Sequence, residues 1–69
     1  MKPDERAFLL AVAAHTGCVR ELIARYPINH KRAWFLLEKW TNKGWYNWGI
    51  TLDLGWLTKA GKQKAQELQ

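Results

Sequence analysis

The sequence predicts a mainly α-helical domain with a small β-hairpin, in which three helices precede the hairpin and one short helix follows it. Up to Gly44 the apolar residues recur every three or four positions, as they do on the buried face of a helix. From Trp45 the spacing shortens toward two, and the chain becomes rich in aromatic and β-branched residues and is broken by glycines. A chain of 69 residues has room for one domain, so we assign residues 1–69 to a single unit.

The first helix is expected over about residues 4–15. Pro3, Asp4 and Glu5 stand ahead of an apolar run, and this order suits a helix start because free backbone N–H groups attract carboxylates. The run ends before Gly17, a residue that readily adopts a positive φ. We therefore expect the chain to reverse there.

Two further helices follow with a very short connection between them. The second is expected over about residues 18–25, and Pro27 closes it because proline disfavours helical geometry in the residue before it. Asn29 is a good N-cap for a third helix over about residues 30–43, which Gly44 ends. The apolar stripe of this helix predicts its buried face, formed by Ala33, Leu36, Leu37 and Trp40.

The hairpin is expected over about residues 45–57. Its turn has two candidate positions, Asn47–Gly49 and Thr51–Asp53, because both contain residues that favour tight turns. Thr58 is a suitable N-cap for a closing helix over about residues 59–68. The sequence leaves the register of the hairpin open.

The chain has five tryptophans, and most of them are expected to have a structural role, because a small core needs large side chains. Trp45 and Trp56 are expected to cover the hairpin against the helices. Trp34 and Phe35 have three competing uses: extension of the core under the hairpin, contact with a thymine methyl group, or a protein interface.

Several classes of protein are excluded by composition. Cys18 is the only cysteine, so no internal disulfide forms, and with two histidines it does not make a four-ligand zinc site. The longest apolar stretch, Ala7–Ala14, is eight residues, too short to span a membrane. No glycine-rich phosphate loop or catalytic pairing is present. We expect a cytoplasmic protein that is not an enzyme, with no metal, cofactor, catalytic residue or small-molecule substrate.

The order of elements describes a helix-turn-helix with a wing attached. The motifs that carry a resemblance are residues 21–29 before the third helix, Lys43-Gly44 at its end, and Leu57-Thr58-Lys59-Ala60-Gly61 after the hairpin. Together with the apolar spacing of the third helix, they resemble the winged helix-turn-helix regulators of bacteria over roughly residues 5–68.

This resemblance implies that the third helix lies in the major groove of double-stranded DNA. Arg32 is suited to bidentate pairing with guanine, and Lys31 and His30 to a base or a phosphate. The charge agrees, since eleven Lys and Arg against six Asp and Glu give a net charge of +5. The expected DNA contacts are Asn29, His30, Lys31, Arg32, Trp34, Phe35, Lys39 and Lys43, with secondary phosphate contacts from Arg20, Arg25, Lys59, Lys62 and Lys64.

Two functions are consistent with these features. The first is a sequence-specific DNA-binding protein, acting as a transcriptional regulator or architectural factor, and the small size suggests a phage, prophage or mobile-element source. The alternative is an interaction module without specific DNA binding, in which Trp34, Phe35, Tyr46 and Trp48 contact a protein partner or a second copy of the chain.

Overall fold

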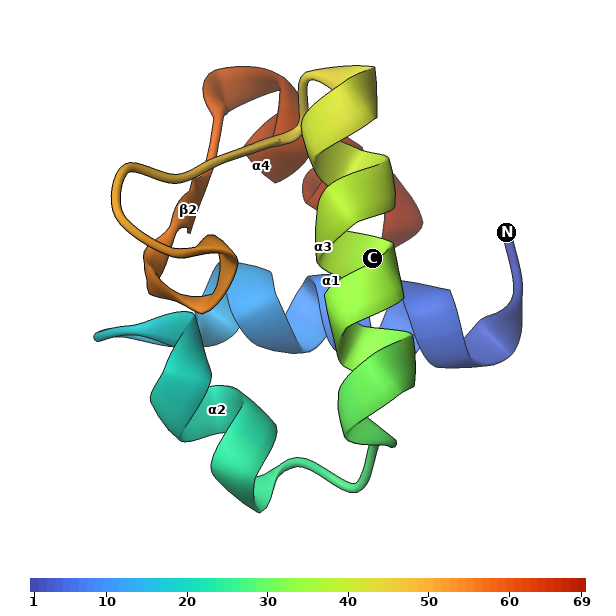
Figure 1. The fold of residues 1–69 in the computed structure, drawn as a ribbon. Coiled ribbons are helices and arrows are strands. Elements are labelled where there is room, and N and C mark those ends of the chain that lie inside the picture. Colours follow the sequence, from blue (N-terminus) through green and yellow to red (C-terminus); the bar gives the residue numbers. More distant parts are fainter.

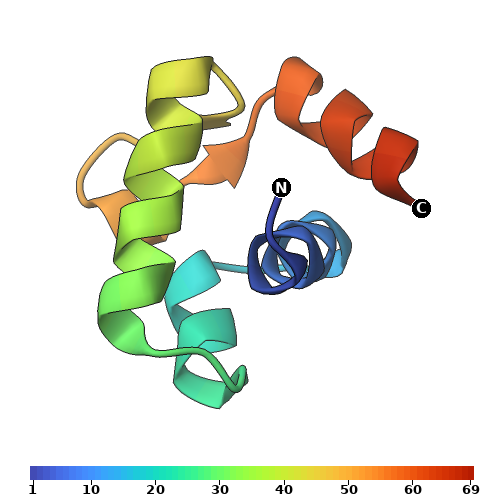
Figure 2. The same cartoon turned by 90° about the vertical axis from the view of Figure 1, so that its right-hand side faces the viewer.

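The computed structural model describes all residues, 1–69, and has four helices and a two-stranded antiparallel hairpin. Helix α3 (His30–Lys43) stands across α1 (Pro3–Ala14), with α2 (Val19–Arg25) below α1 and the hairpin to one side (Figure 1). When α1 is viewed nearly end-on, α4 (Lys59–Leu68) lies beside it and away from α3 (Figure 2). This is the predicted fold class, in the layout of a winged helix. The elements are α1 Pro3–Ala14, α2 Val19–Arg25, α3 His30–Lys43, β1 Tyr46–Asn47, a 3₁₀ turn η1 Leu52–Leu54, β2 Trp56–Leu57 and α4 Lys59–Leu68.

Local capping chemistry sets the boundaries of α3 and α4, and all four helices begin and end within one residue of the predicted positions. The Asn29 side chain accepts hydrogen bonds from the backbone N–H groups of Lys31 (2.8 Å) and Arg32 (3.3 Å) at the start of α3. Gly44 ends α3 in the left-handed conformation, with a φ of 81°. Thr58 Oγ1 accepts from the N–H of Gly61 and caps α4. The expected N-caps at Asn29 and Thr58 are therefore confirmed.

The core forms where the helices meet. The predicted α3 stripe is entirely buried, and the Trp40 ring lies 5.6 Å from the ring of Phe8, which also contacts Tyr26. Trp45 packs against this core from the start of the hairpin, as expected. Trp56 does not, because β2 turns its side chain outward and leaves it 53% exposed. The expectation that Trp56 covers the core is wrong, and Leu57 takes that place.

The hairpin differs from both turns considered. Its strands are only two residues long, pairing Tyr46 with Leu57 and Asn47 with Trp56. Residues 48–55 form a long connection that includes η1, and η1 contacts both α2 and α3. A tight turn does form at the second candidate, where the N–H of Leu54 donates to the carbonyl of Thr51 (3.0 Å), but it lies inside the connection and does not join the two strands directly. Leu52 of this turn is buried in the core and carries the connection inward. The expected hairpin at 45–57 thus exists with much less pairing than predicted.

A buried carboxylate joins α1 to α3. Glu5 is 2% exposed, and its two oxygens accept hydrogen bonds from Lys39 Nζ (2.9 Å) and Trp40 Nε1 (3.0 Å). Burial raises the pKa of Glu5, but the hydrogen bonds from Lys39 and Trp40 outweigh it and hold the pKa below the ordinary value of 4.5. The charged form is therefore the one that the fold stabilises.

We predict that Glu5→Gln lowers the free energy of unfolding by about 1.5–3 kcal/mol near neutral pH, because it removes charge-assisted hydrogen bonds. The folded-state pKa lies below that of the unfolded chain, so the stabilisation is complete above about pH 4.5 and is lost as pH falls through the folded-state pKa. Urea unfolding at about pH 7 and about pH 3 should show the difference between wild type and variant narrowing in acid. Glu67→Gln on the exposed side of α4 is the matched control, and a gap independent of pH would contradict the prediction.

Candidate nucleic-acid interface

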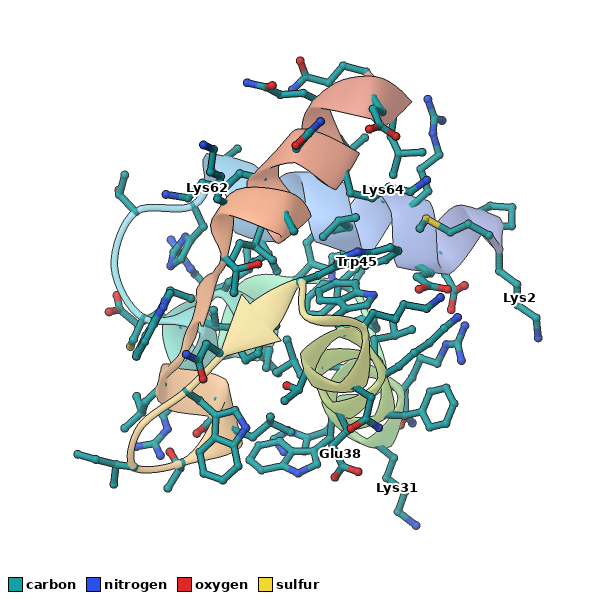
Figure 3. The ribbon with its side chains drawn as sticks, turned by 90° about the horizontal axis from the view of Figure 1, so that it is seen from above. Lys2, Lys31, Glu38, Trp45, Lys62 and Lys64 are labelled. Atoms are coloured by element: carbon teal, nitrogen blue, oxygen red, sulfur yellow. The ribbon has the colours of Figure 1, made fainter.

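The surface of α3 opposite the buried stripe is exposed along its whole length. We call Lys31, Phe35, Glu38 and Asn42 the outer ridge; all four side chains are exposed, and successive members lie about one helical turn apart. Figure 3 looks along α3 and shows Lys31 pointing away from the body of the protein. Neither Lys31 nor Glu38 has an ion-pair partner within 4.0 Å. The ridge therefore carries one free cation and one free anion.

Beside the outer ridge, on the flank toward α1, lies a basic row formed by Arg32, Lys39 and Lys43. Each of these cations already has a neighbour. Arg32 Nε is 2.8 Å from Asp4, Lys39 holds the buried Glu5, and Lys43 Nζ lies 5.1 Å from the centre of the Trp45 ring. The sequence predicted these residues as DNA contacts and contained no sign of their partners within the protein.

The Arg32–Asp4 pair is at the surface. The Arg32 guanidinium donates twice to the Asp4 carboxylate, at 2.8 and 3.2 Å, and lies 5.5 Å from the centre of the Phe35 ring. The hydrogen bond from Arg32 is the main reason why the pKa of Asp4 falls below its ordinary value. Nearly half of the Asp4 side chain is exposed. The contact of Arg32 with DNA stays a prediction, and it requires exchange of Asp4 for a base or a phosphate.

Arg20 ties α2 to the hairpin connection. It donates twice to Asp53 of η1, at 2.8 and 3.2 Å, and Thr51 donates to the same carboxylate at 2.7 Å. The hydrogen bond from Arg20 lowers the pKa of Asp53, although burial opposes it. The Arg20 side chain is still largely exposed, so a secondary phosphate contact stays a prediction, but its visible role is structural.

The other secondary cations are spread over two surfaces. Arg25 at the end of α2 is exposed, as are Lys59 and Lys62 on α4, and none of the three is in an ion pair. Lys64 lies 3.8 Å from Glu67 and 5.9 Å from the Trp45 ring centre, which places it above Trp45 in Figure 3. The α4 lysines lie apart from the outer ridge.

The aromatic residues of α3 separate into two roles. Trp34 is half-buried, packs against the core and stacks on the His30 ring, with the ring centres 5.7 Å apart. Phe35 is 56% exposed, so its use as a core residue is excluded, and contact with DNA or a protein remains. His30 is exposed at the start of α3.

Between α3 and the hairpin connection lies a groove that the sequence did not predict. Its volume is about 500 Å³, and its walls include Trp34, Glu38 and Asn42 of α3 and Trp48, Ile50 and Leu52 of the connection. A hairpin closed by a tight turn has no long connection between its strands, so the expected hairpin gave no second wall for a groove beside α3. The one available signal was Glu38, the only acid in an otherwise basic helix.

Tyr46, expected as an exposed partner contact, is buried at 2% exposure, and that expectation is wrong. Its hydroxyl donates to the carbonyl of Leu52 (2.6 Å) and accepts from the N–H of Gly55 (3.1 Å). Burial is the main cause that raises the pKa of Tyr46 to about 12. Tyr46 thus fixes the connection that forms the groove, whereas Trp48, 39% exposed, stays available at its surface.

The wider comparisons add no relative: no family model matches this sequence, and no curated protein or solved structure matches the chain. No group of three His, Cys, Asp or Glu side chains is placed to hold a metal ion. None of the helices has both the length and the apolar character that crossing a bilayer requires.

We predict that Tyr46→Phe lowers the free energy of unfolding by about 1–3 kcal/mol, because Leu52 O and Gly55 N–H lose their shared partner. In the wild type, stability should fall as pH rises above the ordinary tyrosine pKa of 10.0 toward about 12, since Tyr46 ionises first in the unfolded chain. Urea unfolding and absorbance titration check both effects, and the variant should lose the part of the titration that belongs to Tyr46 and keep that of Tyr26. Tyr26→Phe is the control, because the Tyr26 hydroxyl makes no hydrogen bond within the protein; an equal loss from both variants would refute the role of Tyr46.

Proposed function

We propose that this protein binds double-stranded DNA, with α3 lying in the major groove. The observation that carries the proposal is the exposure of α3: its outer ridge is open to solvent and its basic row is partly so, while α1 and the hairpin contact its other side. A helix presented in this way behind a short turn is the usual reading element of helix-turn-helix proteins. A role as a small transcriptional regulator or architectural factor follows from such binding.

Lys31 is the strongest candidate for a direct contact. It is exposed near the start of α3, has no ion-pair partner, and points away from the protein (Figure 3). His30 lies beside it, and the amide group of Asn29 keeps its N–H donors free while its oxygen caps the helix. In the proposed complex, these three side chains reach bases or phosphates, because the start of α3 lies deepest in the major groove.

The three cations of the basic row are not equally available to contact DNA. A solvent-screened surface ion pair such as Arg32–Asp4 contributes little to stability, so a guanine edge or a phosphate competes well with Asp4. Lys39 is different, because its removal from the buried Glu5 would leave a carboxylate unpaired in the core. Arg32 and Lys43 therefore serve DNA more readily than Lys39 does.

Secondary phosphate contacts come most readily from exposed cations without partners. Arg25 is the best placed, because it ends the helix that precedes α3. Lys59, Lys62 and Lys64 on α4 and Arg20 on α2 would add attraction without sequence preference.

Binding should depend strongly on salt. If four to six phosphates are neutralised, log K should fall against log[salt] with a slope of roughly −3.6 to −5.4. Fluorescence anisotropy of a labelled duplex, begun at about 50 mM salt, measures this slope. Lys31→Ala should reduce its magnitude by about one, whereas Arg6→Gln, the same charge change at a side chain that reaches the end of α4, should leave it almost unchanged. No binding at micromolar protein in low salt would refute the proposal.

Asp4→Asn should raise DNA affinity about fivefold, because it frees Arg32 and removes a negative charge beside the basic row. The same anisotropy titration measures the gain, and urea unfolding confirms that the variant is folded. Glu67→Gln removes the same charge from α4 and should have a much smaller effect. Equal gains from the two variants would mean that net charge alone is responsible, and would remove Arg32 from the interface.

A further inference from the structure

The groove between α3 and the hairpin connection differs in chemistry from the basic row on the other flank of α3. Its apolar walls come from Trp34, Trp48, Ile50 and Leu52. Ile50 is 83% exposed, an unusual position for a large aliphatic side chain. No lysine or arginine lines the groove. This flank therefore offers little attraction to a phosphate backbone.

Glu38 is the only charged side chain in the groove. The other acids all have partners: Asp4, Glu5, Asp53 and Glu67 lie within 4.0 Å of a cation, and Glu21 accepts from the Cys18 thiol. Glu38 has neither an ion-pair partner nor a hydrogen-bond donor within the protein. In a chain with a net charge of +5, one acid is thus left free, and it lines the same groove as two indole rings.

The groove is held in place by the contacts beneath it. Tyr46 fixes the backbone at Leu52 and Gly55, and the Arg20–Asp53 pair anchors η1 to α2. A ligand that enters the groove therefore meets a base, at Leu52, that is already formed, and little ordering of that part of the connection opposes binding.

We infer that this groove binds an arginine side chain of a partner protein, presented on a segment with aliphatic neighbours. The inference rests on charge complementarity. A guanidinium is planar, stacks on indole rings, and pairs with a carboxylate through two parallel hydrogen bonds, so one side chain satisfies both the tryptophans and Glu38. The aliphatic neighbours cover Ile50 and Leu52. Lysine fits less well because its ammonium is compact and strongly hydrated.

The test uses the full chain and the synthetic peptide acetyl-Ala-Leu-Arg-Ile-Ala-amide. Nuclear magnetic resonance follows the indole N–H signals of the five tryptophans during titration. We expect the signals of Trp34 and Trp48 to shift, with half-saturation below about 1 mM, and those of Trp40 and Trp56 to stay. A peptide with citrulline in place of arginine, which has the same shape without the charge, should bind about tenfold more weakly.

Two variants locate the site. Glu38→Gln should weaken binding of the arginine peptide about tenfold, and Trp48→Ala at least as much. Glu67→Gln and Trp56→Ala are the matched controls, since they remove an exposed acid and an exposed tryptophan elsewhere, and should leave the affinity unchanged. Both groove residues are at the surface, so the variants should fold, and unfolding curves verify this.

The peptide-binding inference does not depend on DNA binding, and an experiment can refute either one without refuting the other. Removal of the Glu38 carboxylate should weaken the peptide but leave DNA affinity equal or higher, because it takes a negative charge away from α3. The inference is overturned if millimolar arginine peptide shifts no indole signal. It is also overturned if the citrulline peptide binds the wild type as tightly as the arginine peptide does, or if the Glu38→Gln variant binds the arginine peptide as tightly as the wild type does. It is overturned too if acetyl-arginine amide alone binds as tightly, which indicates a small cationic ligand, or if a duplex shifts the Trp34 and Trp48 signals and the peptide does not.

Discussion

The hydrogen bonds of Glu5 with Lys39 and Trp40 determine which face of α3 is buried and which is exposed. A charged carboxylate at 2% exposure is stable in the core only because Lys39 and the Trp40 indole both donate to it. These donors fix the rotation of α3 about its own axis relative to α1. Once that rotation is set, the apolar stripe faces inward, the outer ridge faces solvent, and the two flanks of α3 point toward α1 and toward the hairpin.

The same arrangement explains why net charge overstates the basic surface of this protein. Four of the eleven lysines and arginines are within ion-pair distance of an acid, and three of these pairs join separate elements. Asp4 and Glu5, at the start of α1, lie against Arg32 and Lys39 of α3. The acids therefore act as local counterions for α3, and the helix presents fewer free cations than its sequence contains. The charged side chains of α3 that remain without an ion-pair partner are Lys31 near its start, Lys43 at its end, and Glu38 on the side of the groove.

Much of the fold could be predicted from sequence, because local rules govern it. Asn29, Gly44 and Thr58 act on their immediate neighbours, so the helix boundaries fell within one residue. The hairpin could not be predicted in the same way, since its connection is drawn inward by Leu52 and held by Tyr46, contacts that no turn rule contains. The ion pairs were also beyond reach, because Arg32 pairs with a residue 28 positions away and Arg20 with one 33 away. For the candidate site this means that the exposed flank of α3 was predictable, whereas its counterions and the groove were not.

The hairpin connection has two segments, one anchored to the fold and one exposed. Leu52 and Asp53 bind it to the core and to α2, whereas Trp48, Gly49 and Ile50 form a tip that the fold hardly uses. Substitutions in the tip should cost little stability, because exposed side chains bury little apolar surface. The tip is therefore the part of this protein that can diverge most freely. A lineage could change the surface offered beside α3 without rebuilding the scaffold, much as other folds vary a loop over a constant frame.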